Sequence, residues 1–335
     1  MADSTIYYRA RSELKNIIRR FFIERSYCEV DTPIAVLTPG AEVHLNYFSS
    51  RWVDYQYNEY PFWLRSSPEI HMKQLLAQGF EKIFQLAVCF RNNGEYAKWH
   101  HPEFTMLEWY QTQIGYKQFI DLTEDLFYYA VEHFSVDGHF TGGRLLPQKF
   151  ERITVTEAFA EFADIVLYDN DCDLAAKARS NGIHSVNATD DFETAFFKIL
   201  IDRIEPGLKR LQASVLYDYP PSQASLAKIE NGCAKRFEFY INGIELSNGF
   251  LELTNLQENK KRFNSVNEQR IQLNKEPIEL DPNFIYALQR GIPDCCGNAL
   301  GFDRLLALLL GHEGIDKVIP FRQMYIDVID PIKLR

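Results

Sequence analysis

Residues 235–253, KRFEFYINGIELSNGFLEL, contain two strand-like runs joined by Asn242-Gly243. An Asn-Gly pair between such runs is typical of a two-residue type I′ turn, so the stretch predicts an antiparallel hairpin. Elsewhere in the chain, helical and strand-like periods follow one another without regular strand–helix alternation. The sequence therefore predicts an α+β fold, with an antiparallel sheet flanked by helices.

The segments around this hairpin supply the other expected elements. A two-residue period predicts strands over 82–90 and 103–110, and a short strand is predicted over 28–33. Helical periodicity predicts helices over 69–78, 121–133, 173–181, 190–204, 256–274 and 301–310, and one that ends near Tyr27. We expect a single domain over residues 1–335, with a helical insertion around 120–210.

Composition excludes several classes of protein. The 335 residues are 46% hydrophobic and carry a formal charge of −10, which favours a globular chain and disfavours nucleic acid as a partner. No apolar run reaches the roughly 18 residues of a membrane span, and the N-terminus does not resemble a signal peptide. The six cysteines form no C-x-x-C pairs, so we expect a reduced, cytoplasmic protein.

Two acids of the hairpin suggest a cation site. Counting outward from the turn pairs Tyr240 with Glu245 and Glu238 with Ser247. Glu238 and Glu245 then share one face as diagonal neighbours, roughly 7 Å apart between Cα atoms. Carboxylates so placed suit a hard divalent cation, although a solvent-exposed face is the alternative interpretation.

Three further residues of the hairpin lie at alternate positions of its second strand: Asn248, Phe250 and Glu252. In a regular strand their parity is opposite to that of Glu245. A bulge at Gly249 would rotate them onto its face.

Three other clusters combine charged residues with aromatic residues or glycine. Strand 103–110 places Phe104, Met106, Glu108 and Tyr110 on one face. Arg91 opens a polar loop with Lys98, His100 and His101, and Gly297, Gly301 and Arg304 surround the start of the last apolar helix. Arg91 and Arg304 suit a phosphate ligand, because the planar guanidinium matches phosphate oxygens. The alternative interpretation of the Arg91 loop is an ordinary solvated loop, and that of Arg304 is a salt bridge with a neighbouring acid.

Together these clusters resemble the three motifs of class II aminoacyl-tRNA synthetases, in the expected order. Residues 21–33, FFIERSYCEVDTP, resemble motif 1; residues 90–110, FRNNGEYAKWHHPEFTMLEWY, resemble motif 2; and residues 297–304, GNALGFDR, resemble motif 3. The matches to H-x-P-E-F-T-M-L-E-W-Y and E-L-x-N-G-F-x-E-L are specific to the lysyl branch. The implied fold is the class II catalytic domain.

Within that branch the sequence is most similar to the elongation factor P lysine ligases, truncated paralogues of lysyl-tRNA synthetase. About twenty residues precede motif 1, so no anticodon-binding OB-fold is expected. Residues 66–69, 221–226 and 293–295 also resemble segments of these ligases. The resemblance implies activation of (R)-β-lysine, or lysine, with ATP and Mg²⁺ as an acyl adenylate, and transfer to a lysine side chain of elongation factor P.

The resemblance also implies roles for individual residues. The catalytic residues are Arg91 on the α-phosphate and Arg304 on the γ-phosphate, and the Mg²⁺ ligands are Glu238 and Glu245. The substrate-binding residues it implies are Ser67, Glu69, Glu108, Tyr110, Asn248, Phe250 and Glu252. The ATP-binding residues it implies are Arg91, Asn93, His101, Phe104, Glu245, Leu246, Gly301 and Arg304.

Two positions depart from the family pattern and leave other functions open. Asn93 stands where the family usually has glutamate, and His101 where it has asparagine. The alternatives are a minimal lysyl-tRNA synthetase acting on tRNA and a catalytically silent paralogue that senses an amino acid. The acidic charge argues against tRNA as a partner, and no membrane is expected. Because motif 1 builds a dimer interface in this class, the resemblance implies a homodimer.

Overall fold

The computed structural model describes residues 5–40, 42–92, 97–137, 139–140 and 145–322. The helices are α1 (Thr5–Glu24), α2 (Glu69–Ala77), α3 (Tyr116–His133), α4 (Val155–Ala163), α5 (Leu174–Ser180), α6 (Phe192–Ile199), the π-helix η1 (Leu200–Ile204), α7 (Glu205–Arg210), the 3₁₀-helix η2 (Pro221–Gln223), α8 (Leu256–Gln272), α9 (Pro282–Arg290) and α10 (Phe302–Leu309). The strands are β1 (Cys28–Glu29), β2 (Ala35–Val36), β3 (Ser49–Val53), β4 (Glu59–Leu64), β5 (Lys82–Phe90), β6 (Glu103–Thr112), β7 (Ser135–Val136), β8 (His139–Phe140), β9 (Glu151–Thr154), β10 (Ala213–Tyr219), β11 (Ile229–Glu230), β12 (Cys233–Ile241), β13 (Ile244–Leu251) and β14 (Cys295–Gly301).

One large sheet organises the described residues. Its strand order is β1-β5-β6-β14-β13-β12-β10-β9, with β11 paired to β12. Along this order, every neighbouring pair from β5 through β10 is antiparallel. At the two ends, β1 pairs in parallel with β5, and β9 pairs in parallel with β10. The predicted α+β fold with an antiparallel sheet is therefore confirmed.

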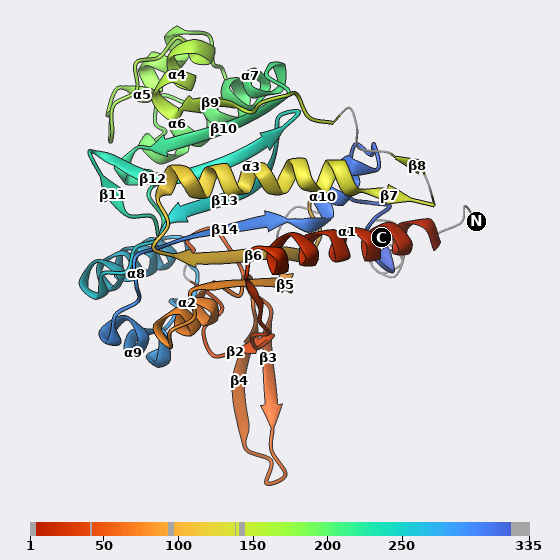
Figure 1. Cartoon of the computed structure of the whole chain (residues 1–335). Helices are drawn as coiled ribbons and strands as arrows, with labels where there is room; N and C mark the ends of the chain where they lie inside the picture. The colour runs from red at the N-terminus through yellow and green to blue at the C-terminus, as the bar shows by residue number, and fades with distance from the viewer. Residues whose placement is uncertain (1–4, 41, 93–96, 138, 141–144, 323–335) are drawn as a thin grey trace, which may run out of the picture.

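Helices α1, α3 and α10 cover one face of this sheet (Figure 1). The buried side of α1 repeats at helical spacing, from Leu14 through Ile17, Ile18, Phe21 and Phe22. These side chains pack on apolar residues of the sheet such as Trp109. This face is the main apolar core, so the polar residues of the strands are directed to the opposite face.

Helices α4 to α7 form a second apolar cluster against β9, β10 and β12 (Figure 1). They occupy residues 155–210, the greater part of the segment in which a helical insertion was expected. The segment between α3 and α4 contains the short strands β7, β8 and β9. The single domain over residues 1–335 and its helical insertion around 120–210 stay predictions.

The hairpin of β12 and β13 turns at Asn242-Gly243, as the sequence predicts, and Tyr240 pairs with Glu245. Beyond that pair the predicted register is wrong. Glu238 pairs with Asn248, not with Ser247, because one extra residue of β13 is accommodated beside Leu246. A bulge of this kind reverses the parity of every later residue on its strand.

The sequence analysis considered a bulge at Gly249 that would move later residues onto the face of Glu245. The structure has a bulge with this effect, but it lies at Leu246. It brings Asn248 and Phe250 onto the face of Glu238 and Glu245, because paired residues of neighbouring strands share a face. Gly249 is needed for a different reason. A Cβ at this position would lie 2.3 Å from the Phe237 ring.

Side chains from α8 and the turn after it hold a loop over this polar face. Arg270 Nη1 donates to the carbonyl oxygens of Glu42 and Leu45, at 2.8 Å each. Lys275 Nζ donates to the carbonyls of Val43 and His44 at 3.0 and 2.8 Å. These bonds fix the loop by its backbone.

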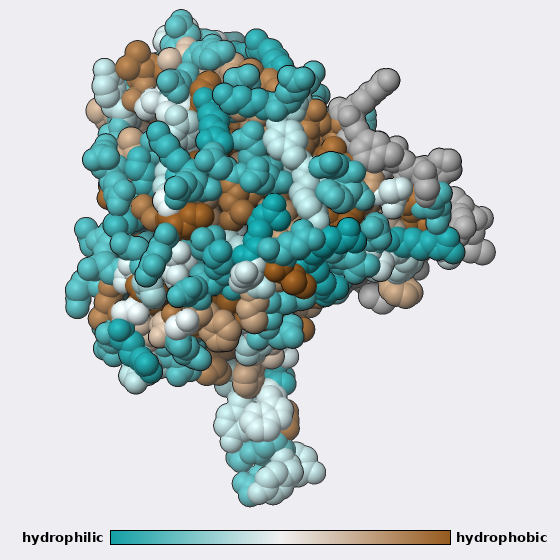
Figure 2. Space-filling model, viewed as in Figure 1, coloured by the Kyte–Doolittle hydropathy of each residue, from teal (hydrophilic) through white to brown (hydrophobic). Residues whose placement is uncertain are grey.

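The hairpin of β3 and β4 was not among the predicted elements. It projects from the body of the molecule (Figures 1 and 2) and exposes Trp52, Tyr55, Tyr57 and Tyr60.

Among the residues described here, no helix combines the length and apolarity that crossing a bilayer requires.

Candidate active site

A cavity of about 800 Å³ opens on the polar face of the sheet. That volume lies within the range of ordinary small-molecule sites. The sequence-predicted residues that line it are Ser67, Glu69, Arg91, His101, Phe104, Glu108, Tyr110, Glu238, Glu245, Leu246, Asn248, Phe250, Glu252, Gly301 and Arg304. Asn93 lies outside the described residues. Every other predicted site residue is thus brought to one cavity from distant parts of the chain.

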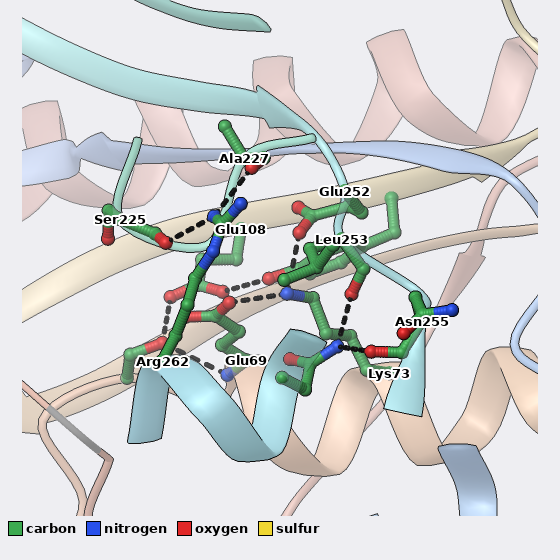
Figure 3. Close-up of polar contacts among 12 residues, drawn as sticks. Glu69, Lys73, Glu108, Ser225, Ala227, Glu252, Leu253, Asn255 and Arg262 are labelled. Atoms are coloured by element: carbon green, nitrogen blue, oxygen red, sulfur yellow. Dashed lines mark hydrogen bonds and ion pairs between the residues drawn. The ribbon is translucent and has the colours of Figure 1, made fainter. Parts of the chain in front are cut away.

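The part of the cavity lined by Glu69, Glu108 and Glu252 is called the acidic end. Here a buried lysine, Lys73, lies between two of the acids (Figure 3). Its Nζ is 2.5 Å from Glu69 Oε1 and 2.5 Å from Glu252 Oε2, and its side chain is 2% exposed. Burial opposes the charge of Lys73, but the two carboxylates outweigh it and raise the lysine pKa.

Glu108, the third acid, is bound by neutral donors. Ser67 Oγ donates to its Oε1 at 2.5 Å, and the Tyr110 hydroxyl donates to its Oε2 at 3.0 Å. Burial, together with the negative charges of Glu69 and Glu252, raises the Glu108 pKa to about 8. The two hydroxyl donors act in the opposite direction but do not outweigh these effects.

Gly297 makes room for this arrangement. A Cβ on Gly297 would lie 2.2 Å from Cε1 of Tyr110 and 2.3 Å from Oε1 of Glu252. Only glycine fits beneath these two side chains. The motif 3 glycine therefore acts on the acidic end from the neighbouring strand.

Glu238 lies in a dense network of hydrogen bonds. Its Oε2 accepts from the hydroxyls of Tyr219 and Tyr240, at 2.5 and 2.7 Å, and its Oε1 accepts from Arg236 Nη2 at 2.5 Å. A carboxylate has about four acceptor sites, so three are used and one remains on Oε1. Glu238 is thus largely neutralised by Arg236, which the sequence analysis did not single out.

Glu245 carries the less compensated charge of the pair. Burial, and next the charge of Glu238, raises the Glu245 pKa. Glu205, at the start of α7, also lines the cavity, and burial and the charges of Glu245 and Glu238 raise its pKa to about 7. Carboxylates that raise one another's pKa define a place where a cation would be stabilised.

Arg304 connects motif 3 to the motif 2 loop. Its Nη1 donates to the carbonyl oxygen of Glu245 at 2.7 Å, and its Nε donates to that of Trp99 at 3.3 Å. Its Nη2 lies 3.0 Å from Nε2 of His100. These contacts hold the guanidinium mainly by carbonyl oxygens, and its ion pair with Glu245 Oε2 is long, at 3.9 Å.

Arg91 lies at the same end of the cavity, beside Phe104. Its guanidinium carbon is 5.2 Å from the centre of the Phe104 ring. Its Nε is buried and has no hydrogen-bond partner among the residues that the structure describes. A buried donor without a partner is costly, which favours an anionic ligand here. The part lined by Arg91, Phe104 and Arg304 is called the phosphate end.

A buried ion pair supports the phosphate end from behind. Asp303 accepts from Arg11 of α1, and its Oδ2 accepts from the backbone N–H of Thr105 at 2.6 Å. Arg11 also donates to the Thr105 hydroxyl. Asp303, the neighbour of Arg304, thereby holds α1, β6 and α10 together.

His101 stands where the family has asparagine. It lines the cavity, and its Nδ1 is 2.6 Å from the carbonyl oxygen of Glu103. Burial lowers the His101 pKa, so the ring is neutral at physiological pH. A neutral ring offers hydrogen bonding to a nucleotide, as an asparagine would.

The most informative residue that sequence reasoning missed is Lys73. It lies four residues after Glu69 on a predicted helix, and residues so spaced are neighbours on the helix surface. That spacing could have predicted the contact with Glu69. The contact with Glu252, 179 residues further along the chain, had no local signal.

The fold and the cavity define a class of protein. A family model described as tRNA synthetases class II (D, K and N) matches residues 3–325, and the chain belongs to this family. The resemblance drawn from the three motifs is thereby confirmed. Membership implies an enzyme of the ligase type that uses ATP.

Curated relatives narrow the class. A protein of Vibrio atlanticus is 36% identical over 93% of this chain and 94% of its own, and one of Histophilus somni is 37% identical over 93% of both. One of Proteus mirabilis is 34% identical over 93% of both. Each is named elongation factor P–(R)-β-lysine ligase. At this identity over nearly the full length, the chain is a member of that group.

Proposed function

We propose that this chain activates (R)-β-lysine, or lysine, with ATP and transfers the acyl group to a lysine side chain of elongation factor P. One observation carries the proposal. One end of the cavity has three carboxylates, which suit the ammonium groups of an amino acid. The other end has two arginines and an aromatic ring, which suit a nucleoside triphosphate. The relatives named above have this activity in their names.

In the proposed first step, the substrate carboxylate attacks the α-phosphate of ATP. Arg91 contacts the phosphoryl oxygens and stabilises the negative charge that develops on them. Arg304 binds the departing pyrophosphate, and Phe104 stacks on adenine. The acidic end binds the two ammonium groups and so places the substrate carboxylate next to the phosphate end.

The residues at the turn-proximal end of the β12–β13 hairpin fit a divalent cation. Glu245, with its raised pKa, and the one remaining acceptor site of Glu238 would hold Mg²⁺, which would neutralise phosphate charge when bound. Glu205 lies near enough to both to affect their charge. Leu246 and Gly301 would contact the nucleotide through their backbone.

In the second step a neutral lysine amine of elongation factor P attacks the carbonyl carbon of the acyl adenylate. The new amide bond forms as the bond to the phosphate oxygen breaks, and AMP leaves. No side chain is assigned as the general base, because positioning of the two reactants supplies a large part of the acceleration.

We further propose a homodimer that works in the cytoplasm as one catalytic domain. The end strand β1 lies beside exposed apolar side chains, Ile23, Ile34 and Leu37, on the motif 1 side of the sheet. Light scattering at micromolar concentration tests this. A mass of one chain, 39.1 kDa, would contradict the homodimer.

The function is tested by ATP–pyrophosphate exchange with (R)-β-lysine, α-lysine or no amino acid, followed by acylation of elongation factor P. Exchange that prefers (R)-β-lysine, with a mass increase on elongation factor P, is the expected result. Charging of tRNA without acylation of the protein would favour the minimal synthetase. Absence of exchange with either amino acid would favour the silent paralogue.

A further inference from the structure

The acidic end contains a feature that the proposed reaction does not use. Lys73 is the one cation in contact with its carboxylates among the described residues, and at 2% exposure it is sealed from solvent. Its two partners come from α2 and from the residue after β13 (Figure 3). A buried charge with two short ion pairs is fixed in position, because moving it would leave it unpaired.

The charges at this end can be counted. When Glu69, Glu108 and Glu252 are all ionised, the state that bound ammonium groups favour, the carboxylates contribute −3 and Lys73 contributes +1, so the pocket carries −2. An amino acid with two ammonium groups brings +2 on these groups. The bound state is therefore neutral, which is the condition for burying charges at low cost.

Without Lys73 the same pocket would hold three carboxylates that repel one another. Removing the cation raises the pKa of Glu252, because the Lys73 charge is what lowers it against burial and the charge of Glu69. One of the acids would then take up a proton near neutral pH. Glu69 and Glu252 would also lose the cation that bridges them and fixes their positions.

The other groups around Lys73 do not replace its charge. From β6, Glu108 and the Tyr110 hydroxyl lie near its two partner carboxylates, and from β14 Cys295 lies near Lys73 itself. Glu42 lies near Glu69, and burial raises the Glu42 pKa. Burial raises the pKa of both Tyr110 and Cys295 well above the ordinary values, so both are neutral. Arg91 lies at the opposite end of the cavity.

We propose that Lys73 is a positioning residue that sets the charge of the amino-acid pocket. It cancels one of three carboxylates and holds Glu69 and Glu252 in place, so that the pocket matches an amino acid with two ammonium groups. The inference rests on the proposed function, since it concerns how that substrate is bound. Lys73 acts through its two glutamates and has no assigned contact with the substrate.

The test is Lys73→Met, which removes the charge and keeps the length of the side chain. Amino-acid-dependent pyrophosphate exchange is measured between pH 6.5 and 8.5. We expect the KM for (R)-β-lysine or lysine to rise about tenfold at pH 7, the effect of one pKa unit. The KM for ATP should change less than twofold.

The pH dependence separates charge balance from a merely structural role. Below the raised pKa of the unpaired acids, a proton neutralises one of them and weakens binding. Above it, all carboxylates are ionised and attract the ammonium groups again. The ratio of variant to wild-type KM should therefore fall as pH rises. A ratio that is constant with pH, or an equal rise in the KM for ATP, would overturn the proposal.

A double variant covers the case in which Lys73→Met does not fold. Lys73→Met with Glu69→Gln removes both members of one ion pair and restores a charge of −2, from Glu108 and Glu252. We expect a lower KM at pH 7 than in Lys73→Met, or folding where the single variant fails. A double variant that binds worse than Lys73→Met would contradict charge balance.

Lys198→Met is the matched control. Lys198 of α6 pairs with Asp190 at 2.7 Å, outside the cavity, so the same chemical change there should leave both KM values unaltered. Failure of the wild type to exchange with either diamino acid would overturn the proposed function and this inference together. Wild-type exchange with a pH-independent ratio would overturn the inference alone.

Discussion

The two ends of the cavity handle charge in opposite ways. At the acidic end, charged side chains contact one another: Lys73 joins two glutamates, and Glu252 and Lys73 are 1% and 2% exposed. At the phosphate end, Arg304 is held by the backbone carbonyls of Glu245 and Trp99, and Arg91 has a buried Nε without a partner among the described residues.

The difference follows from what each end must bind. Ammonium groups need carboxylates at set positions, and three neighbouring carboxylates, of which Glu108 and Glu252 are buried, are stabilised together by an internal cation. Phosphates need cations whose charge is still available. Holding an arginine by carbonyl oxygens fixes its direction without cancelling its charge. The acidic end therefore pairs part of its charge within the protein before binding, whereas the phosphate end keeps the charge of its arginines for the ligand.

The largest effect should come from Arg91, whose buried Nε has no hydrogen-bond partner among the described residues. Arg91→Ala should lower the rate of pyrophosphate exchange by about 10²–10³-fold, as loss of one donor to developing charge does. The control is Arg51→Ala in the projecting hairpin, where the pair with Glu59 is exposed. Wild-type exchange in Arg91→Ala would refute the assignment of the phosphate end.

The support behind the phosphate end should show in stability. Arg11→Met leaves Asp303 buried without its cation, so the free energy of unfolding should fall by about 3 kcal/mol. Urea unfolding followed by circular dichroism measures this. Arg9→Met, which breaks an exposed pair with Asp137 two residues earlier on α1, should cost less than about 1 kcal/mol. Equal losses would mean that the Arg11 pair gives no special support.

Glu252 distinguishes the two ends by their substrates. Glu252→Gln removes a charge-assisted contact, so the KM for the amino acid should rise roughly 10- to 100-fold. The KM for ATP should change little, because the phosphate end is separate. Glu59→Gln, in an exposed pair with Arg51 on the projecting hairpin, is the control. A parallel rise in both KM values would show that the ends are not independent.

The smallest effect is a pH dependence confined to the acidic end. Glu108 has a pKa raised to about 8, so it is protonated below that pH and charged above it. Alkyl ammonium groups stay protonated in this range. The KM for the amino acid should therefore fall between pH 6.5 and 8.5 while that for ATP stays flat. The slope should vanish in Glu108→Gln, and its persistence there would assign the titration to another group.

The sequence predicted the parts of this comparison that have local signals. The Asn242-Gly243 turn, strand 82–90 and the start of α2 at Glu69 follow from turn chemistry and periodicity and are confirmed. The motif resemblance predicted that the site residues lie close together, and those that the structure describes line one cavity. Their roles stay predictions.

Contacts between distant segments were beyond such reasoning. Tyr219 reaches Glu238 from β10, a strand that the periodicity analysis did not identify. The bulge beside Leu246 involves no glycine or proline, so no residue type signalled it. The projecting hairpin of β3 and β4 was missed because its strands are exposed and lack an alternating apolar face.

The bulge also limits how this hairpin can vary in length during evolution. Side chains of a strand alternate between its two faces. A one-residue deletion beside Leu246 would therefore turn Asn248, Phe250 and Glu252 toward the apolar core, and Gly249 and Leu251 toward the cavity. Insertions at Asn242-Gly243 would leave the pairing of both strands intact. Viable length variation among descendants of this gene should therefore collect at the turn and avoid the strand.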